Sequence, residues 1–82
     1  MKDLKETVAL MISADYKERF QAEYYQVAIR YAKLNKMVEA WDKGELTFTP
    51  TCPRKIYDRQ LAAMKDYLCI LEERAKLEDV NI

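Results

Sequence analysis

Apolar residues recur with alternating spacings of four and three residues in two separate segments of the chain. Each step of this kind returns a side chain to the same side of an α-helix, so the spacing predicts a helical packing seam. The first ladder of seam residues is Phe20, Tyr24, Val27, Tyr31, Leu34, Val38 and Trp41, and the second ladder is Tyr57, Leu61, Met64, Leu68, Leu71 and Ala75.

The two ladders stay in register when the chain folds back at the loop between them. Trp41 then lies opposite Tyr57, and Tyr24 lies opposite Ala75. We therefore predict an all-α fold in which two long helices form an antiparallel hairpin. The chain is expected to be one helical domain, residues 1–82, because so short a chain supports a single core at most.

A further short helix is predicted before the hairpin, over about residues 2–12. Leu4, Val8 and Met11 form its apolar face. A helix of this length is not stable alone, so it must dock on the hairpin. The remaining elements are predicted as a helix over about residues 14–43, a loop over residues 44–53, a helix over about residues 54–78 and a tail over residues 79–82.

Capping residues set these helix ends. Ser13 is predicted as the N-cap of the long helix. Gly44, the only glycine, falls where a helix C-terminus needs a residue that tolerates positive φ. Thr51 or Cys52 is predicted to cap the last helix, with Pro53 in its first turn, where the missing N–H costs nothing.

The chain carries more apolar surface than one hairpin can bury. A second apolar stripe lies beside the second ladder and consists of Ile56, Ala63, Tyr67, Ile70 and Leu77. The N-terminal helix can cover part of the extra surface, and another copy of the chain is the most economical cover for the rest. We predict a homo-oligomer in which hairpins assemble into a helical bundle.

The composition argues against several classes of function. Fourteen basic and fourteen acidic side chains cancel, so no overall field draws the chain to long nucleic acid or to an anionic membrane. Without histidine, a Gly-rich phosphate loop or a CxxC motif, we predict no enzyme, no catalytic residue, no metal site and no cofactor. No signal peptide or apolar segment of roughly 20 residues is present, which favours a cytoplasmic location.

One part of the chain is locally basic. Arg30, Lys33 and Lys36 are the only charged residues between Tyr24 and Val38. Lysine and arginine bind phosphate and tyrosine stacks on bases, so this segment, with the tyrosines near it, is suited to a small nucleotide. The alternative is structural: tyrosines at seam positions belong to the core, and the cations form a solvated face.

Tyr16 is a candidate site residue of a different kind. It stands off the ladder, close to the predicted start of the long helix. The main-chain N–H groups of a helix start favour an anion, so a base stacked on Tyr16 would hold its phosphate near them.

The chain resembles a widespread family of short phage proteins that includes the anti-CBASS sponges. The shared pattern is E-Y, R-x-x-K-L, a loop, Q-x-x-A-M-x-x-Y and L-x-x-R, and these motifs extend over about three quarters of the chain. The pattern occurs here at Glu23-Tyr24, at residues 30–34, at residues 60–67 and at residues 71–74, which end in Arg74.

The resemblance implies a compact, all-helical homo-oligomer that captures a signalling nucleotide in the cytoplasm of the infected host cell without cleaving it. Lys33 matches the lysine that contacts phosphate in such proteins, and Tyr16 is the best match for the stacking aromatic residue. Arg30, Lys36, Tyr24 and Arg74 complete the candidate ligand-binding set. The Pro-rich loop departs from the sponges, so the ligand stays open between a cyclic dinucleotide, a cyclic trinucleotide and a cyclic ADP-ribose type signal. The alternative is a small helical interaction protein that binds and inhibits a host protein.

Overall fold

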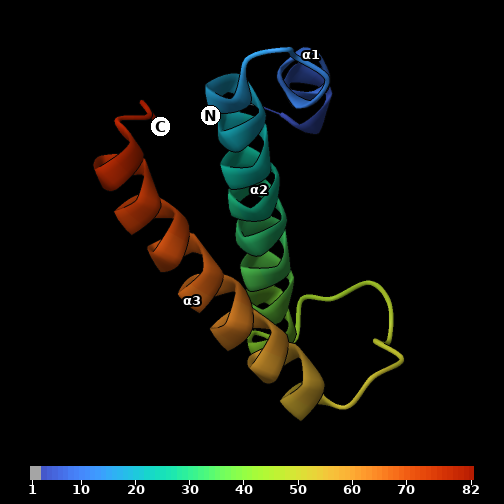
Figure 1. Cartoon of the computed structure of the whole chain (residues 1–82). Coiled ribbons are helices and arrows are strands. Elements are labelled where there is room, and N and C mark those ends of the chain that lie inside the picture. The colour runs from blue at the N-terminus through green and yellow to red at the C-terminus, as the bar shows by residue number, and fades with distance from the viewer. Residues whose placement is uncertain (1–2) are drawn as a thin grey trace.

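The protein is an all-helical hairpin in a computed structural model that describes residues 3–82. The 3-10 helix η1 (Leu4–Thr7) runs directly into the short helix α1 (Val8–Met11), and the two long helices are α2 (Tyr16–Asp42) and α3 (Arg54–Glu78). α2 and α3 are the antiparallel arms of the hairpin (Figure 1). No strand occurs in the described part of the chain. The predicted all-α class is therefore confirmed.

The packing seam between α2 and α3 follows the two ladders. Between residues 57 and 75, every side chain that is at least partly buried belongs to the second ladder. At the loop end the rings of Trp41 and Tyr57 meet edge to face, with centroids 5.9 Å apart. At the other end Leu71 and Ala75 are buried against Phe20. The predicted contact between Trp41 and Tyr57 is confirmed. At the open end Tyr24 packs against the cluster that contains Ala75, as predicted.

The start of α2 differs from its prediction. Asp15, not Ser13, is the N-cap, and its carboxylate accepts a hydrogen bond from the Lys17 N–H at 2.9 Å. The Ser13 hydroxyl instead accepts from the Asp15 N–H at 3.0 Å and donates to Glu18 at 2.6 Å. Because this turn holds the backbone extended at Asp15, the helix begins two residues later than a cap at Ser13 would allow.

The loop between α2 and α3 begins as predicted and ends differently. Gly44 follows the last turn of α2 with φ of +70°, the left-handed conformation expected of it. Pro53 is itself the N-cap of α3 and provides no side-chain hydrogen bond. The prediction that Thr51 or Cys52 caps α3 was therefore wrong. Cys52 and Cys69 are both exposed and free.

The N-terminal segment docks on α2 alone. The described residues do not form one continuous α-helix over 2–12: a 3-10 turn capped by Asp3 precedes α1, and residue 2 lies outside the described part. η1 and α1 contact α2 and not α3. Thr7 is buried there, and its hydroxyl accepts from the Gln26 amide at 3.0 Å.

Residues 79–82 follow α3 as the predicted tail, but they fold back and pack on the hairpin, which was not predicted. Asp79 adopts a left-handed conformation with φ of 56° and turns the chain back toward the hairpin. The Val80 N–H then donates to the Ala75 carbonyl at 2.8 Å, and the Val80 side chain is buried against Phe20 and Leu71. The tail therefore closes the open end of the hairpin.

The second apolar stripe stays uncovered in one chain. Ile70 is 54% exposed and Leu77 is 86% exposed, and Ile56, Ala63 and Tyr67 are exposed as well. The single hairpin thus leaves this surface available, as expected from the sequence. Within residues 3–82, no helix combines the length and the apolar character needed to cross a membrane.

Candidate ligand-binding site

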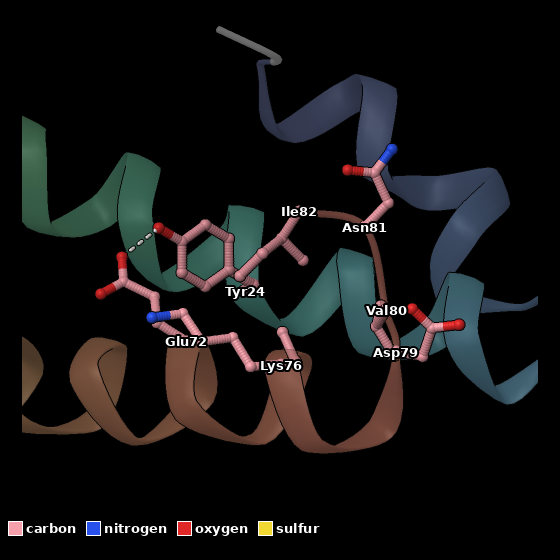
Figure 2. A pocket seen from close by; sticks show the side chains of 8 residues that line it. Tyr24, Glu72, Lys76, Asp79, Val80, Asn81 and Ile82 are labelled. Atoms are coloured by element: carbon pink, nitrogen blue, oxygen red, sulfur yellow. Dashed lines mark hydrogen bonds between the residues drawn. The ribbon is translucent and has the colours of Figure 1, made fainter.

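A cavity lies at the open end of the hairpin, between α2, α3 and the tail (Figure 2). Its volume is about 470 Å³. Tyr24 lines it from α2, Glu72 and Lys76 line it from α3, and residues 79–82 form its remaining wall. The site therefore joins α2 to the C-terminal part of the chain.

Tyr24 and Glu72 form a hydrogen-bonded pair in this cavity. The Tyr24 hydroxyl donates to a Glu72 carboxylate oxygen at 2.7 Å (Figure 2). This hydrogen bond, together with partial burial, raises the pKa of Tyr24 to about 12, because the neutral phenol is the form that donates. The ring also meets Tyr25 edge to face, with centroids 5.8 Å apart. Tyr24 is therefore held in one orientation.

Two side chains of α2 hold the tail wall in place. The Lys17 ammonium group donates to the Asp79 carbonyl at 3.0 Å, and the Gln21 amide donates to the Asn81 carbonyl at 2.8 Å. Both bonds use main-chain oxygens of the tail. The wall is thus positioned by α2 through the main chain of residues 79 and 81.

The basic segment of α2 is a separate surface. Arg30, Lys33 and Lys36 are all exposed, and none of them forms an ion pair with another described residue. Lys36 also borders a small cavity of about 160 Å³ that Glu39 and Glu45 line as well. Lys33 is at the centre of the three.

Tyr16 stands at the first position of α2, as expected for a ring at a helix start, and is 49% exposed. The N-cap carboxylate of Asp15 already accepts from the Lys17 N–H. A phosphate at this helix start would therefore meet a negative charge and one N–H fewer than an uncapped helix offers. A base can still stack on the Tyr16 ring without a phosphate bound at the helix start.

Arg74 lies at the open end, in contact with the core. Its guanidinium carbon is 4.8 Å from the centre of the Phe20 ring, and its Nε donates to Glu78 at 2.9 Å. The Glu78 hydrogen bond raises the pKa of Arg74 further. Part of its donor capacity is thus already used within the chain.

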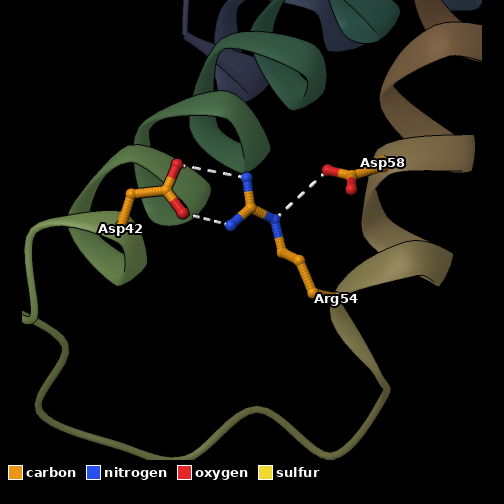
Figure 3. Close-up of polar contacts among 3 residues, drawn as sticks. All are labelled: Asp42, Arg54 and Asp58. Carbon is orange, nitrogen blue, oxygen red and sulfur yellow. Dashed lines mark hydrogen bonds and ion pairs between the residues drawn. The ribbon is translucent and has the colours of Figure 1, made fainter.

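The loop end carries a polar clasp around Arg54. Arg54 donates to both carboxylate oxygens of Asp42 and, through Nε at 3.2 Å, to Asp58 (Figure 3). The Arg54 hydrogen bond lowers the pKa of Asp42. The guanidinium also lies 5.6 Å from the Trp41 ring centre. This arrangement ties α3 to the end of α2.

One chain does not bring the six predicted site residues together. Tyr24 lines the large cavity, Arg74 contacts the core, and the three cations lie on the middle of α2. Tyr16 and Lys33 are 17 residues apart on one helix, which separates them by about 25 Å along its axis. A single small ligand cannot contact both within one chain.

Glu72 and Lys76 are cavity residues that the sequence interpretation missed. The signal was present in the register, because placing Ala75 opposite Tyr24 also brings the residues three before and one after Ala75 near Tyr24. They look like solvated charges in the sequence, since neither interrupts an apolar pattern. The tail wall had no comparable signal.

Comparison with known proteins identifies one family. The Sequestin family model matches residues 14–77, which include all of α2 and all of α3 except its last residue. No curated protein and no solved structure matches the chain. The matched segment is most of the sequence, and the family name denotes a sequestering protein. The chain therefore belongs to the Sequestin family.

Proposed function

We propose that this protein sequesters a nucleotide second messenger of a host anti-phage system, in the cytoplasm of the infected cell, without cleaving it. Membership of the Sequestin family supports capture of a partner. The observation that carries the nucleotide assignment is the row of exposed, unpaired cations Arg30, Lys33 and Lys36 in a chain with no net charge. Such a row supplies charge-assisted hydrogen bonds to phosphate oxygens.

The proposed ligand site uses two copies of the chain. Tyr16 stacks on a base and Lys33 contacts a phosphate, and about 25 Å separates these residues along one helix. Both can reach one small ligand when they come from different copies. The exposed stripe that includes Ile70 and Leu77 provides apolar surface for that assembly.

Ligand capture is tested by screening the purified protein against cyclic dinucleotides, cyclic trinucleotides and cyclic ADP-ribose isomers in a thermal-shift assay. A ligand at 100 times its dissociation constant stabilises the folded state by about 2.7 kcal/mol. The bound nucleotide is then released by heat and analysed by mass spectrometry. An unchanged nucleotide supports sequestration, and a hydrolysed or linear product contradicts it.

The site residues are tested by calorimetry with the nucleotide that the screen identifies. Lys33→Ala is expected to weaken binding roughly tenfold or more, since a hydrogen bond to a charged group contributes about 1.5–3 kcal/mol. Tyr16→Ala is expected to lose about 1–3 kcal/mol of stacking. Lys55→Ala is the control, because Lys55 is an exposed lysine outside the proposed site, in the first turn of α3. Wild-type affinity in both site variants would exclude this site.

Assembly is tested by sedimentation at micromolar concentration. The wild-type protein is expected to be a homo-oligomer, and Ile70→Glu is expected to dissociate it by placing a charge in the apolar interface. A monomeric wild type would contradict the two-copy site.

The same exposed stripe favours a second candidate function. A helix face with Ile56, Tyr67, Ile70 and Leu77 exposed is also suited to a groove or helix of a host protein. In that case the protein is a monomer with no nucleotide ligand, and it inhibits its partner by covering it. The mass and the nucleotide content of the purified protein distinguish the two functions: an oligomer that binds a nucleotide supports sequestration, and a monomer without nucleotide supports the host-protein inhibitor.

A further inference from the structure

The cavity at the open end has the dimensions of a small-ligand site. Its volume of about 470 Å³ falls within the usual range of roughly 300–1,000 Å³ for such sites. One chain builds it completely, from α2, α3 and the tail (Figure 2). It therefore differs from the Tyr16 and Lys33 site, which needs two copies.

The apolar wall of the cavity is suited to a flat ring. Tyr24 and Ile82 line the cavity, and both pack against the core that includes the buried Val80. The hydrogen bond to Glu72 fixes the orientation of the Tyr24 ring. A planar base entering the cavity can thus stack on a preformed aromatic face and bury apolar surface against the tail.

The polar wall can recognise the edge of such a ring. Glu72 uses one carboxylate oxygen for Tyr24, and its other oxygen forms no hydrogen bond with a described residue. An ionised carboxylate accepts hydrogen bonds only, so this oxygen is complementary to an amino or ring N–H group. Figure 2 shows the unused oxygen beside the one that binds Tyr24.

Both signs of charge line the cavity. Glu72 and Asp79 disfavour a phosphate inside the cavity through like-charge repulsion. Lys76 lines the same cavity and has no ion pair with another described residue. Its ammonium group is therefore available to a phosphate attached to the base.

We infer that this cavity is a base-binding subsite within a single chain, in which Tyr24 stacks on a purine or pyrimidine, Glu72 accepts from its amino group and Lys76 contacts the attached phosphate. The inference rests on the proposed function, since the base and the phosphate that it places are parts of a nucleotide. It adds a site that survives dissociation of an oligomer. On α3, Ile70 and Glu72 point about 160° apart, so the exposed stripe and the cavity occupy different sides of the helix.

The test uses adenosine 5′-monophosphate, adenosine and ribose 5-phosphate as probes, with binding followed by amide NMR shifts in the wild type and in Ile70→Glu. Adenosine 5′-monophosphate is expected to bind both proteins with similar affinity and to shift the amides of Tyr24, Glu72 and Val80. Ribose 5-phosphate, which lacks the base, is expected to bind at least about tenfold more weakly. Equal binding of the two probes would overturn the base subsite.

Glu72→Gln and Glu73→Gln form a matched pair of variants. Both glutamates are exposed and both changes remove one charge, but Glu73 does not line the cavity. Glu72→Gln is expected to weaken adenosine 5′-monophosphate about tenfold, and Glu73→Gln is expected to leave it unchanged. Lys76→Ala is expected to weaken the monophosphate and not adenosine. Circular dichroism verifies that each variant is folded.

The outcomes separate this inference from the proposed function. Wild-type affinity in Glu72→Gln, or no binding of adenosine 5′-monophosphate by the wild type, overturns the base subsite. If 3′,3′-cyclic GMP–AMP or cyclic ADP-ribose still binds in that case and Lys33→Ala weakens it, the proposed function stands without the subsite. If no nucleotide of the wider screen binds, both fail.

Discussion

The two ends of the hairpin are stabilised in different ways. At the loop end a covalent connection already joins α2 to α3, and the contacts there are an edge-to-face aromatic pair and the exposed clasp around Arg54. At the open end no loop joins the helices. There Phe20, Leu71 and Val80 form a buried cluster, and the tail crosses the gap.

A cluster of buried apolar residues thus lies where the chain provides no connection, while Val38 is buried singly nearer the loop. Leu71, in this cluster, is completely buried, whereas Leu61, on the same ladder nearer the loop, is only partly buried. The large cavity adjoins the buried end. Changes that weaken the open end are therefore expected to affect both stability and ligand binding, and changes at the loop end to affect stability alone.

The largest expected effect is that of Leu71→Ala. Removing this fully buried side chain is expected to lower the free energy of unfolding by about 2–5 kcal/mol, since it leaves a cavity in the core. Leu61→Ala is the matched change nearer the loop and is expected to cost less. Urea denaturation at one fixed protein concentration measures both. Equal losses of unfolding free energy in the two variants would show that both ends of the hairpin contribute equally to stability.

Val80→Ala tests whether the tail closes the open end. Loss of two methyl groups from a buried position is expected to lower the free energy of unfolding by about 1.5 kcal/mol. Asn81→Ala is the control, because Gln21 binds the main-chain oxygen of Asn81 and not its side chain. A loss no larger for Val80→Ala than for Asn81→Ala, in the same urea experiment, would mean that the tail adds no stability.

Gly44→Ala tests the backbone at the loop end. Gly44 has φ of +70°, and nothing lies within 4 Å of a Cβ placed there, so the cost is conformational and not steric crowding. We expect a loss of about 1 kcal/mol. Gly44→Asn is expected to lose less, since asparagine tolerates this conformation better. Thermal melting compares the three proteins, and an unchanged melting temperature in Gly44→Ala would contradict the assignment.

The smallest effect is expected from the Arg54 clasp, which is exposed to solvent and screened by salt. The pKa of Asp42 is lower in the folded chain than its ordinary value of 3.8. Its stabilising contribution is therefore present above that value and is lost as the pH falls below it. Melting temperatures of the wild type and Arg54→Gln are expected to converge in this acidic range. A difference that grows on acidification would contradict this role.

The sequence predicted the parts of the fold that depend on helix periodicity. The ladders identify the side of each helix that forms the α2–α3 seam, because a spacing of four and three residues has one geometric meaning on a helix. Ala22 and Ile29 of α2 are buried although they lie off the ladder. The packing of the tail was not predicted, because a segment of four residues has no period. Its burial depends on contacts with Phe20, some 60 residues earlier, which no local pattern encodes.

The candidate site was less predictable than the fold. Arg30, Lys33 and Lys36 are exposed as expected, since they project from α2 in a different direction from the ladder residues. Tyr24 was assigned both to the core and to the site, and it occupies a boundary between them, with its hydroxyl on Glu72. A seam position alone does not reveal which polar group meets the ring.

The distance along the sequence between contacting residues also determines the order in which the hairpin assembles and opens. The tail bonds of Lys17 and Gln21 join residues 62 and 60 positions apart, whereas Asp42 and Arg54 are 12 positions apart. Short loops close at a lower entropic cost, so folding is expected to begin at the loop and to finish with docking of the tail. Native-state hydrogen exchange is then expected to be faster at Val80 than at Val38, because the tail can detach while the seam stays closed. Such partial opening gives a small molecule a route to Tyr24 that does not require the protein to unfold.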